Sequence, residues 1–391
     1  MPRWRLPRRP LAAGAPDSWD QLEGARAAAL LAEAAYFVNA PEMMLASALL
    51  AVDMAERTGL PAPVSTAYGM LAVVLGMARL HATARRYLTP ARTIAEAAND
   101  PYQQGVAWFY SGIYHGCLGD WQASLAASRR GLEITDALGA YMLSGRQLTV
   151  IATNALYTSD YADTRAWMHI VRTRAERLAN VQQIGWSGNV VSVADLHQGR
   201  YAEAIARAEQ SREIFLREHD PISLTISEGV RCTALARSGQ LEAAREGADR
   251  ATRLTAGARP TTWGQLEGFA GPCEVYATLL VHRLATPQAL RARLSSALAP
   301  LRLFALVFPF GRPRYHWLRG QLALAAGRQD TARRHLVRAL ATARRFGMPY
   351  EEWRATEVLG AVAGGEAHAL RAQARQARVA AGAALQASQA A

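Results

Sequence analysis

The histidines, cysteines and acidic residues of the sequence show none of the spacings typical of a catalytic or metal site. His115 and Cys117 are two residues apart, which on a helix points them away from each other. None of the nine histidines forms the His-x-x-x-His pair of a helical metal site, and no Gly-x-Ser-x-Gly nucleophile motif occurs. Glu351 and Glu352 stand at an expected helix start, where acidic residues favour the helix dipole. We therefore expect no enzyme activity, no cofactor and no metal.

The basic residues exclude several kinds of chemistry, because all 44 of them are arginine. Without lysine there is no phosphate-loop lysine and no Schiff-base lysine, so the chain is not itself a P-loop ATPase. Residues 283–345 hold thirteen arginines and a single acid, Asp330, against a net charge of +12 for the whole chain. Such a stretch is either a solvated helix face or a patch for an acidic protein surface or a nucleic-acid backbone. The candidate patch residues are Arg312, Arg314, Arg319, Arg333, Arg334 and Arg338.

Aromatic residues interleave with these arginines, as stacking platforms for bases do. Phe304, Phe308 and Phe310 are the nearest examples, although "LRLFALVFPF" reads more naturally as a buried helix end. Nucleic-acid binding is therefore the alternative to a solvated face, and not the first expectation.

Cysteine usage and hydropathy indicate the compartment. Cys117, Cys232 and Cys273 lie far apart, which suits small buried side chains in a reducing compartment, and we expect a cytoplasmic protein. No apolar run approaches the roughly 18–20 residues that span a bilayer, so no membrane partner is expected. Residues 1–20 are expected to form a flexible basic lead-in and residues 386–391 a disordered tail.

Turn-forming residues recur at a nearly fixed interval and define the architecture. Gly119-Asp120, Ser159-Asp160, Gly199-Arg200 and Gly239-Gln240 follow one another every 40 residues. Further turns in this series are expected at Pro41, Arg79, Ala285, Gly327 and Gly365. The apolar residues between turns recur at three and four, as in helices. The pattern predicts an all-α right-handed superhelix of about nine helix-turn-helix repeats over residues 21–385.

Small residues at two positions of most repeats support this prediction, with Leu290 and Leu370 as exceptions at the first of them. Five residues after the first turn residue come Ala46, Ala84, Ser124, Thr164, Ala204, Ala244 and Ala332. Twelve residues after it come Ala91, Gly131, Val171, Ser211, Ala251, Ala297 and Ala339. Small side chains there let neighbouring helices approach closely. Asp120 and Asp160 are expected N-caps, and Pro61, Pro101 and Pro221 are expected in the first turns of helices.

The pattern of an aromatic residue, glycines and small residues resembles the tetratricopeptide repeat. Residues 105–138 match it at Trp108, Gly112, Gly119, Asp120, Trp121, Ser124, Gly131 and Leu132. Residues 185–218 match at Gly199, Tyr201, Ala204 and Ile214, and residues 313–346 at Gly320, Gly327, Ala332, Leu336, Ala339 and Leu340. The resemblance covers about residues 27–385, with a period near 40 where the common form has 34.

The long period and the segment "GQLALAAGRQDTARRHLVRALATARRFGMPYEEWRATEVLG" look like a narrower group. They are similar to the C-terminal repeat halves of bacterial signalling ATPases, some of them adenylate/guanylate cyclase-associated, and of MalT-like regulators. That resemblance implies a repeat module that senses a ligand or partner, and an upstream ATPase or cyclase module in a longer protein. No phosphate-binding motif or cyclase aspartate pair can be placed in this chain, so neither activity carries over to it.

The first helices of the repeats are expected to line a concave groove that binds a peptide or protein partner. Projection of the repeat onto that groove selects aromatic and polar residues, which are typical of binding surfaces, although several could equally be core between repeats. The candidates are Phe109, Tyr110, Arg146, Thr153, Tyr157, Trp186, Asn189, His197 and Arg237. Asn189 resembles the asparagine of carboxylate-clamp grooves, but the clamp's lysines are absent, so we expect no recognition of a free C-terminal carboxylate.

Overall fold

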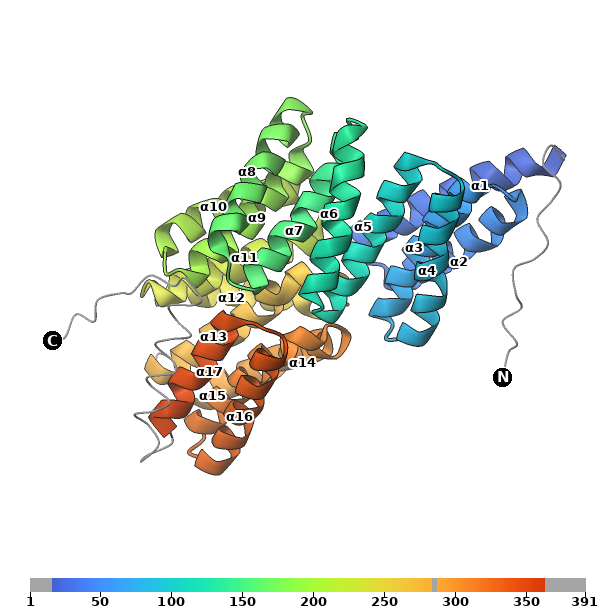
Figure 1. The fold of residues 1–391 in the computed structure, drawn as a ribbon. Coiled ribbons are helices and arrows are strands. Elements are labelled where there is room, and N and C mark those ends of the chain that lie inside the picture. Colours follow the sequence, from blue (N-terminus) through green and yellow to red (C-terminus); the bar gives the residue numbers. More distant parts are fainter. Residues whose placement is uncertain (1–15, 283–286, 363–391) are drawn as a thin grey trace. The chain divides into compact units, whose positions relative to one another are not determined.

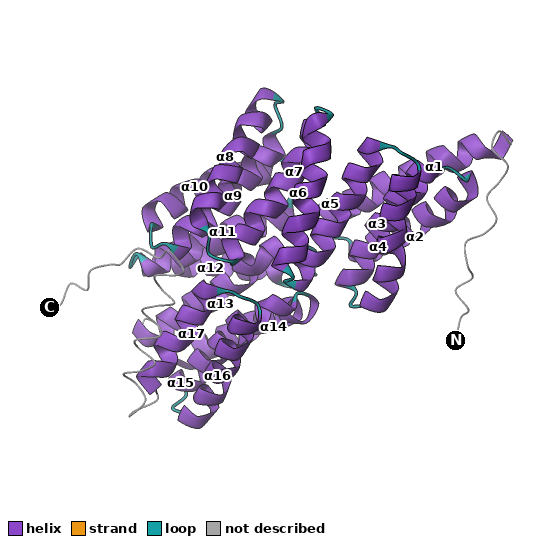
Figure 2. Cartoon of the chain, in the orientation of Figure 1, coloured by secondary structure: helices purple, strands orange, loops and turns teal. Residues whose placement is uncertain are grey.

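The structure, a computed structural model, describes residues 16–282 and 287–362. Every regular element in these two ranges is a helix, and no strand occurs in them (Figure 2). The chain divides into two compact units, of which unit 1 ends at Val150 and unit 2 begins at Ile151. The all-α repeat architecture is confirmed.

Unit 1 contains six helices and the first part of a seventh (Figure 1). They are α1 (Pro16–Phe37), α2 (Pro41–Thr58), α3 (Pro61–Met77), α4 (His81–Ala97), α5 (Pro101–Leu118), α6 (Trp121–Ala137) and α7 (Tyr141–Tyr157). Helix α1 begins before residue 21, so the helical region starts earlier than predicted. The proposed lead-in up to residue 15 and the proposed tail at 386–391 lie outside the described residues.

Unit 2 contains the rest of α7 and the helices that follow it. They are α8 (Tyr161–Arg177), α9 (Val181–His197), α10 (Tyr201–Arg217), α11 (Pro221–Arg237), α12 (Leu241–Thr255), η1 (Trp263–Gln265), α13 (Leu266–His282), α14 (Pro287–Val307), η2 (Pro309–Gly311), α15 (Arg312–Ala325), α16 (Gln329–Arg345) and α17 (Pro349–Val362). The described residues thus hold eight consecutive helix pairs and one further helix. The predicted turns at Ala285 and Gly365 lie outside them.

A residue in the left-handed conformation ends each helix of the regular part of the chain. These residues stand at intervals of 20 and are Asn39, Gly59, Arg79, Asn99, Gly119, Gly139, Ser159, Ala179, Gly199, His219 and Gly239. Glycine takes this conformation without strain, which explains its use at about half of the positions. The predicted turns at Arg79, Gly119, Ser159, Gly199 and Gly239 are confirmed.

The first predicted turn was wrong by two residues, because Pro41 is already inside α2 and the left-handed residue is Asn39. Ala46, predicted to be a small buried residue, is consequently exposed. Helix starts elsewhere follow the prediction. Asp120 and Asp160 each accept a hydrogen bond from the third residue of the next helix, and Pro61, Pro101 and Pro221 begin α3, α5 and α11.

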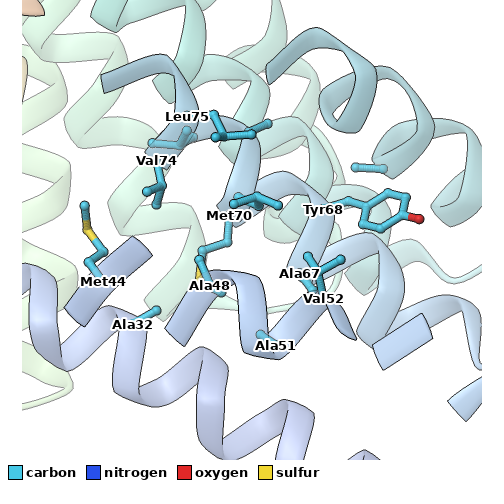
Figure 3. Packing of buried hydrophobic residues seen from close by; sticks show 14 of the residues in the cluster. Ala32, Met44, Ala48, Ala51, Val52, Ala67, Tyr68, Met70, Val74 and Leu75 are labelled. Atoms are coloured by element: carbon cyan, nitrogen blue, oxygen red, sulfur yellow. The ribbon is translucent and has the colours of Figure 1, made fainter. Parts of the chain in front are cut away.

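Small buried residues let the helices pack closely, as the repeat pattern predicted. Ala84, Ala91, Thr164 and Val171 are fully buried, and the hydroxyl of Ser124 on α6 donates to the carbonyl of Gly112 on α5 at 2.7 Å. In unit 1 the core is built largely of alanine, with Met44, Val52, Met70 and Leu75 filling the space between helices (Figure 3). Trp121 and Tyr161 are buried at the starts of α6 and α8.

The regular repeat is interrupted after Gly257, where additional residues precede α13. The hydroxyl of Thr262 and the side chain of Gln265 form a capping box around η1. Helix α13 then crosses α11 at backbone contact: a Cβ atom on Gly229 would lie 2.2 Å from the carbonyl oxygen of Glu267, and one on Gly271 would lie 2.4 Å from that of Gly229. This close crossing fixes where the side chains of α13 lie in unit 2. Within the described residues, none of the helices has the length and hydropathy needed to cross a membrane.

Candidate functional site

The partly exposed side of α5 is the first part of a candidate site in unit 1. Tyr110 packs on Gly69 of α3, and Gly112 packs on Ser128 of α6, so those two sides of α5 are occupied. Tyr102, Phe109 and Ile113 are spaced by seven and four residues and lie on the side between them. Tyr102 is 50% exposed, and the other two are partly exposed.

Helix α7 lies beside α5 and extends this side. The side-chain amide of Gln147 donates to the carbonyl of Gly105 at 3.1 Å, which sets the register of the two helices. Met142, Arg146 and Thr149 follow one face of α7, and Met142 is 51% exposed. We call the six residues Tyr102, Phe109, Ile113, Met142, Arg146 and Thr149 the unit 1 surface.

An ion pair connects the unit 1 surface with α1. The guanidinium of Arg146 is paired with the carboxylate of Glu33, and both side chains remain about one-third exposed or more. Burial and the nearby Glu33 raise the pKa of Tyr110 to about 12, and Arg146 opposes this shift. Glu33, Tyr110 and Arg146 are therefore close neighbours, and three first helices of the repeat converge here. Of the predicted groove residues, Phe109, Tyr110 and Arg146 are brought together.

The chemistry available at the unit 1 surface is that of binding. It offers aromatic and aliphatic area with one ion pair, which is the composition of protein–protein contact surfaces. In the described ranges no group of three or more potential metal ligands is found. The thiols of Cys117, Cys232 and Cys273 are buried, and burial raises the pKa of each.

The predicted groove residues of α9 are engaged inside unit 2. The indole nitrogen of Trp186 donates to the hydroxyl of Ser223 at 3.2 Å, and the amide of Asn189 donates to the carbonyl of Ser223 at 2.9 Å. The hydroxyl of Ser227 donates to the side-chain carbonyl oxygen of Asn189 at 2.7 Å. Asn189 is 2% exposed, so it serves α9–α11 packing and not an open groove. Thr153 on α7 is likewise buried.

Tyr157, His197 and Arg237 also make contacts within unit 2, and the burial of Tyr157 and His197 contradicts their prediction as groove residues, whereas Arg237 stays partly exposed. The Tyr157 hydroxyl donates to the carbonyl of Trp263 at 2.7 Å. His197 donates a hydrogen bond from Nε2 to the Glu267 carboxylate at 2.9 Å, and its Nδ1 lies 3.3 Å from the Tyr161 hydroxyl. Arg237 donates to the hydroxyl of Tyr350 at 2.7 Å. Tyr157 and His197 are buried and cannot line an open surface.

These contacts surround a buried ion cluster that the sequence did not reveal. Arg314 is completely buried and donates to three carboxylates, those of Glu267 at 3.0 Å, Glu274 at 2.6 Å and Glu351 at 2.6 Å. Arg354 donates to both oxygens of Glu274 at 2.7 and 2.8 Å, and Arg237 adds a further bond of 2.8 Å. We call this set the Arg314 cluster, consisting of Arg237, Glu267, Glu274, Arg314, Glu351 and Arg354.

Charge balance makes the Arg314 cluster possible, because three arginines face three glutamates. Burial alone would raise the pKa of Glu274, but Arg354, Arg314 and Arg237 hold it well below the usual value. Burial lowers the pKa of His197, and this outweighs its hydrogen bond to Glu267, so His197 is neutral there. The cluster joins α11, α13, α15 and α17 and fills the side of unit 2 on which these first helices meet.

Aromatic rings complete the packing around the Arg314 cluster. The Arg354 guanidinium lies 3.8 Å from the centre of the Trp317 ring, and the Trp317 indole donates to the Arg354 carbonyl at 3.1 Å. Phe304, Phe308 and Phe310 are fully buried and pack on one another. They are therefore core residues, as the buried-helix interpretation had it, and the alternative role as stacking platforms was wrong.

The predicted basic patch is divided by the fold. Arg314 is not a surface residue, because it is the centre of the buried cluster. Arg319, Arg333, Arg334 and Arg338 are exposed and Arg312 is partly exposed. One signal in the sequence could have located the cluster: Glu267 and Glu274 stand seven residues apart in the otherwise apolar helix "LEGFAGPCEVYATLLVH". Carboxylates on one buried helix face require cations, and Arg314 supplies one.

Comparison of the sequence with protein-family models and with curated proteins gave no match. Solved structures do share the fold. A Rap protein complexed with competence and sporulation factor superposes with a TM-score of 0.57 and 13% identity, over 84% of this chain and 99% of the Rap chain. The chain has a tetratricopeptide-like helical-repeat fold. At this level of identity the likeness establishes the fold alone.

Proposed function

We propose that the chain is a non-catalytic binding module and that it takes an extended peptide segment of a partner on the unit 1 surface. The observation that carries the proposal is the contrast between the two units. In unit 2 the first helices meet around the Arg314 cluster and its buried aromatic residues. In unit 1 the equivalent side keeps Tyr102 and Met142 half exposed beside Phe109 and the Arg146–Glu33 pair.

The chemistry of the unit 1 surface suits a peptide with an apolar anchor next to a charged side chain. Aromatic and arginine residues contribute most of the binding energy in protein interfaces. The Arg146–Glu33 pair is partly solvated, so a partner can replace either side of it at little electrostatic cost. The Rap protein of similar fold was solved with competence and sporulation factor bound, which supports a partner-binding role for a chain of this fold.

The wider setting that we propose follows from the resemblance of the repeats. We infer a regulatory role in bacterial signalling, in the cytoplasm, with an ATPase or cyclase module as one possible partner in a longer protein. This part of the proposal rests on the repeat period and the segment at 320–360. It predicts that the genomic neighbour or fused upstream region encodes a nucleotide-binding module.

The test of peptide binding is a display selection. A random peptide library is selected on the full immobilised wild-type chain alone, and the enriched peptides are then tested for binding to the double variant Phe109→Ala/Arg146→Ala. The proposal predicts enriched peptides that share an apolar anchor and bind the wild-type chain. The matched control is Leu138→Ala/Arg130→Ala, which removes the exposed apolar residue that follows α6 and an exposed arginine of α6 in the same unit. Peptides that bind both double variants equally well would contradict the proposed surface.

A second candidate function is binding of an acidic partner or nucleic acid by the arginines of α15 and α16. The observation in its favour is that Arg319, Arg333, Arg334 and Arg338 are exposed on two adjacent helices. A salt titration of oligonucleotide binding tests the nucleic-acid form, because a set of phosphate contacts loses affinity steeply as salt rises. Absence of binding at low salt would remove that form of the candidate.

A further inference from the structure

Two histidines face each other between α15 and α16. Gly320 of α15 packs against Leu336 of α16 so closely that a Cβ atom would lie 2.9 Å from the Leu336 Cγ. This approach brings the Nδ1 atoms of His316 and His335 to 3.2 Å, with the ring centres 5.4 Å apart. Both side chains remain partly exposed. A contact between two ring nitrogens requires one N–H and one bare nitrogen, so the two rings share a donor and an acceptor.

Arginines surround this histidine pair on both helices. Arg312 and Arg319 come from α15, and Arg334 and Arg338 from α16. Burial, His335 and the guanidinium groups of Arg338, Arg312 and Arg319 lower the pKa of His316 to about 4. Burial, Arg319, Arg338 and Arg334 lower the pKa of His335 in the same way. Acidic side chains are not among the main causes of either shift, whereas arginines are, so the field at this point is positive.

Few hydrogen bonds or ion pairs within the described residues fix the side chains of these four arginines. Among the residues that the structure describes, Arg312, Arg319 and Arg338 make no side-chain hydrogen bond or ion pair, and Arg334 donates only to the hydroxyl of Thr331, at 3.2 Å. Elsewhere in the same unit, arginines of comparable exposure are paired, for example Arg344 with Glu352 at 2.7 Å and Arg207 with Asp195 at 3.0 Å. Four guanidinium groups around two neutral imidazoles therefore form an anion site.

A metal ion does not suit this site, although a histidine pair is a common ligand set. Four nearby positive charges oppose the approach of a cation, and two ring nitrogens already bonded to each other leave too few ligands. A dianion suits it well. Guanidinium groups match the oxygens of a phosphate group as bidentate donors, and a protonated imidazole adds a further N–H. A phosphate monoester carries close to two charges at pH 7 and presents three oxygens, whereas a phosphodiester carries one charge and presents two.

We propose that His316, His335, Arg312, Arg319, Arg334 and Arg338 form a binding site for a phosphate monoester group. The group lies over the histidine pair and is held by the surrounding guanidinium groups, and its two charges draw a proton onto the pair. The monoester belongs to a small phosphorylated metabolite or to a phosphorylated side chain of a partner. The inference is independent of peptide binding at the unit 1 surface, since it involves residues of unit 2 alone.

The experiment is calorimetric titration of the full chain at about 50 mM salt, where surface electrostatics are weakly screened. The probes are phenyl phosphate, a peptide containing phosphoserine, and dimethyl phosphate as the diester control. We expect both monoesters to bind at least about 10-fold more tightly than the diester, consistent with the loss of one charge-assisted contact. A small metabolite as the source predicts equal binding of phenyl phosphate and the peptide, and a phosphorylated partner predicts tighter binding of the peptide.

Variants decide whether the site is the one proposed. Arg319→Ala/Arg338→Ala should weaken phenyl phosphate binding by at least about 10-fold, and His316→Asn should weaken it while removing the proton uptake that accompanies binding. Arg345→Ala, an exposed arginine near the end of α16, is the matched control and should change binding less than about 2-fold. Absence of monoester binding would overturn the proposal. So would binding that Arg345→Ala and Arg319→Ala/Arg338→Ala weaken equally, or preferential binding of an oligonucleotide, which would indicate an extended nucleic-acid surface.

Discussion

The ring of His197 lies flat against the ring of Tyr350, with centroids 3.7 Å apart and planes 13° apart. His197 ends α9 and Tyr350 stands in the first turn of α17, so this stack joins two residues that are 153 positions apart in the sequence. The same two residues contact the Arg314 cluster, His197 through Glu267 and Tyr350 through Arg237. The stack and the cluster together hold the first helices of unit 2 on one another, and they explain why unit 2 offers little open surface on that side.

Removal of the central cation should destabilise the protein strongly. Arg314→Met leaves Glu267 and Glu351 buried with too few partners, so we expect the free energy of unfolding to fall by about 3–5 kcal/mol in urea titration. The exposed Arg319→Ala on the same helix should change it by less than about 0.5 kcal/mol. The triple variant R314M/E267Q/E351Q should recover part of the loss, because it also removes the uncompensated charges. Failure to recover any stability would show that Arg314 acts by its shape alone.

The stability of the protein should fall as the pH falls from about 7 to 5, with His197 as one source. The pKa of His197 is lowered by burial in the folded protein, whereas the unfolded chain binds a proton near the ordinary value of about 6.5. The unfolded state therefore gains protons first as the pH falls, and stability decreases. His197→Gln removes this contribution, so its unfolding free energy should vary less over this range than that of the wild type. Equal slopes for the two proteins would contradict a neutral buried His197.

A second loss of stability should follow at lower pH. Arg314 and His197 hold the pKa of Glu267 below its usual value, and Arg354, Arg314 and Arg237 do the same for Glu274. The stability that these carboxylates confer is complete above their unfolded pKa of about 4.3 and is lost as the pH falls below it. Urea titrations at a series of pH values should therefore show a steeper decline below pH about 4.5 than above it. Glu274→Gln should be less stable at neutral pH and should show a shallower decline.

The crossing of α11 and α13 depends on glycine. Gly271→Ala would place a methyl group 2.4 Å from the carbonyl oxygen of Gly229, which forces the two backbones apart, and we expect a cost of about 1–3 kcal/mol or more. Gly264→Ala is the matched control, since its nearest neighbours would be 3.9 Å away. Thermal unfolding should separate the two variants by several degrees. Equal midpoints would show that the crossing tolerates a wider separation.

The left-handed position at Ala179 offers a stabilising substitution. Ala179 has φ of 50°, a conformation that costs a non-glycine residue about 1 kcal/mol. Ala179→Gly should therefore raise the unfolding free energy by up to about 1 kcal/mol, reduced by the greater freedom of glycine in the unfolded chain. Ala98→Gly, at a helix end with φ of −74°, should lower it instead. Urea titration of both variants checks the opposite signs.

The fold could be predicted from the sequence because the signals that define each repeat are local in the sequence. Gly119 and Gly239 end helices by a property of their own backbone, Asp120 caps the next helix, and Ser124 is small where α5 and α6 touch. None of these signals requires knowledge of distant residues. The period of 40 was therefore predicted correctly. The first turn is the exception, because Pro41, the first residue of α2, was mistaken for the turn itself.

The sites could be predicted only in part, because they depend on contacts between distant helices. The position in the repeat selected Phe109 and Arg146, which are partly exposed on the proposed unit 1 surface. The same criterion also selected Asn189 and His197, which neighbouring helices bury. Arg314 could not be told from Arg319 by composition, since both stand in an arginine-rich segment. The difference comes from the carboxylates of Glu274 on α13 and Glu351 on α17, which contact Arg314 and not Arg319.

Hydrogen exchange measured by mass spectrometry, with and without a display-selected peptide, tests the central claim most directly. If the peptide occupies the unit 1 surface, amides in α5 and α7 around residues 102–113 and 142–149 should exchange more slowly in its presence. Phe109→Ala/Arg146→Ala should lose that protection and bind the peptide at least about 10-fold more weakly, while Leu138→Ala/Arg130→Ala should keep both. Protection confined to α9–α17, or unchanged affinity in Phe109→Ala/Arg146→Ala, would contradict the account.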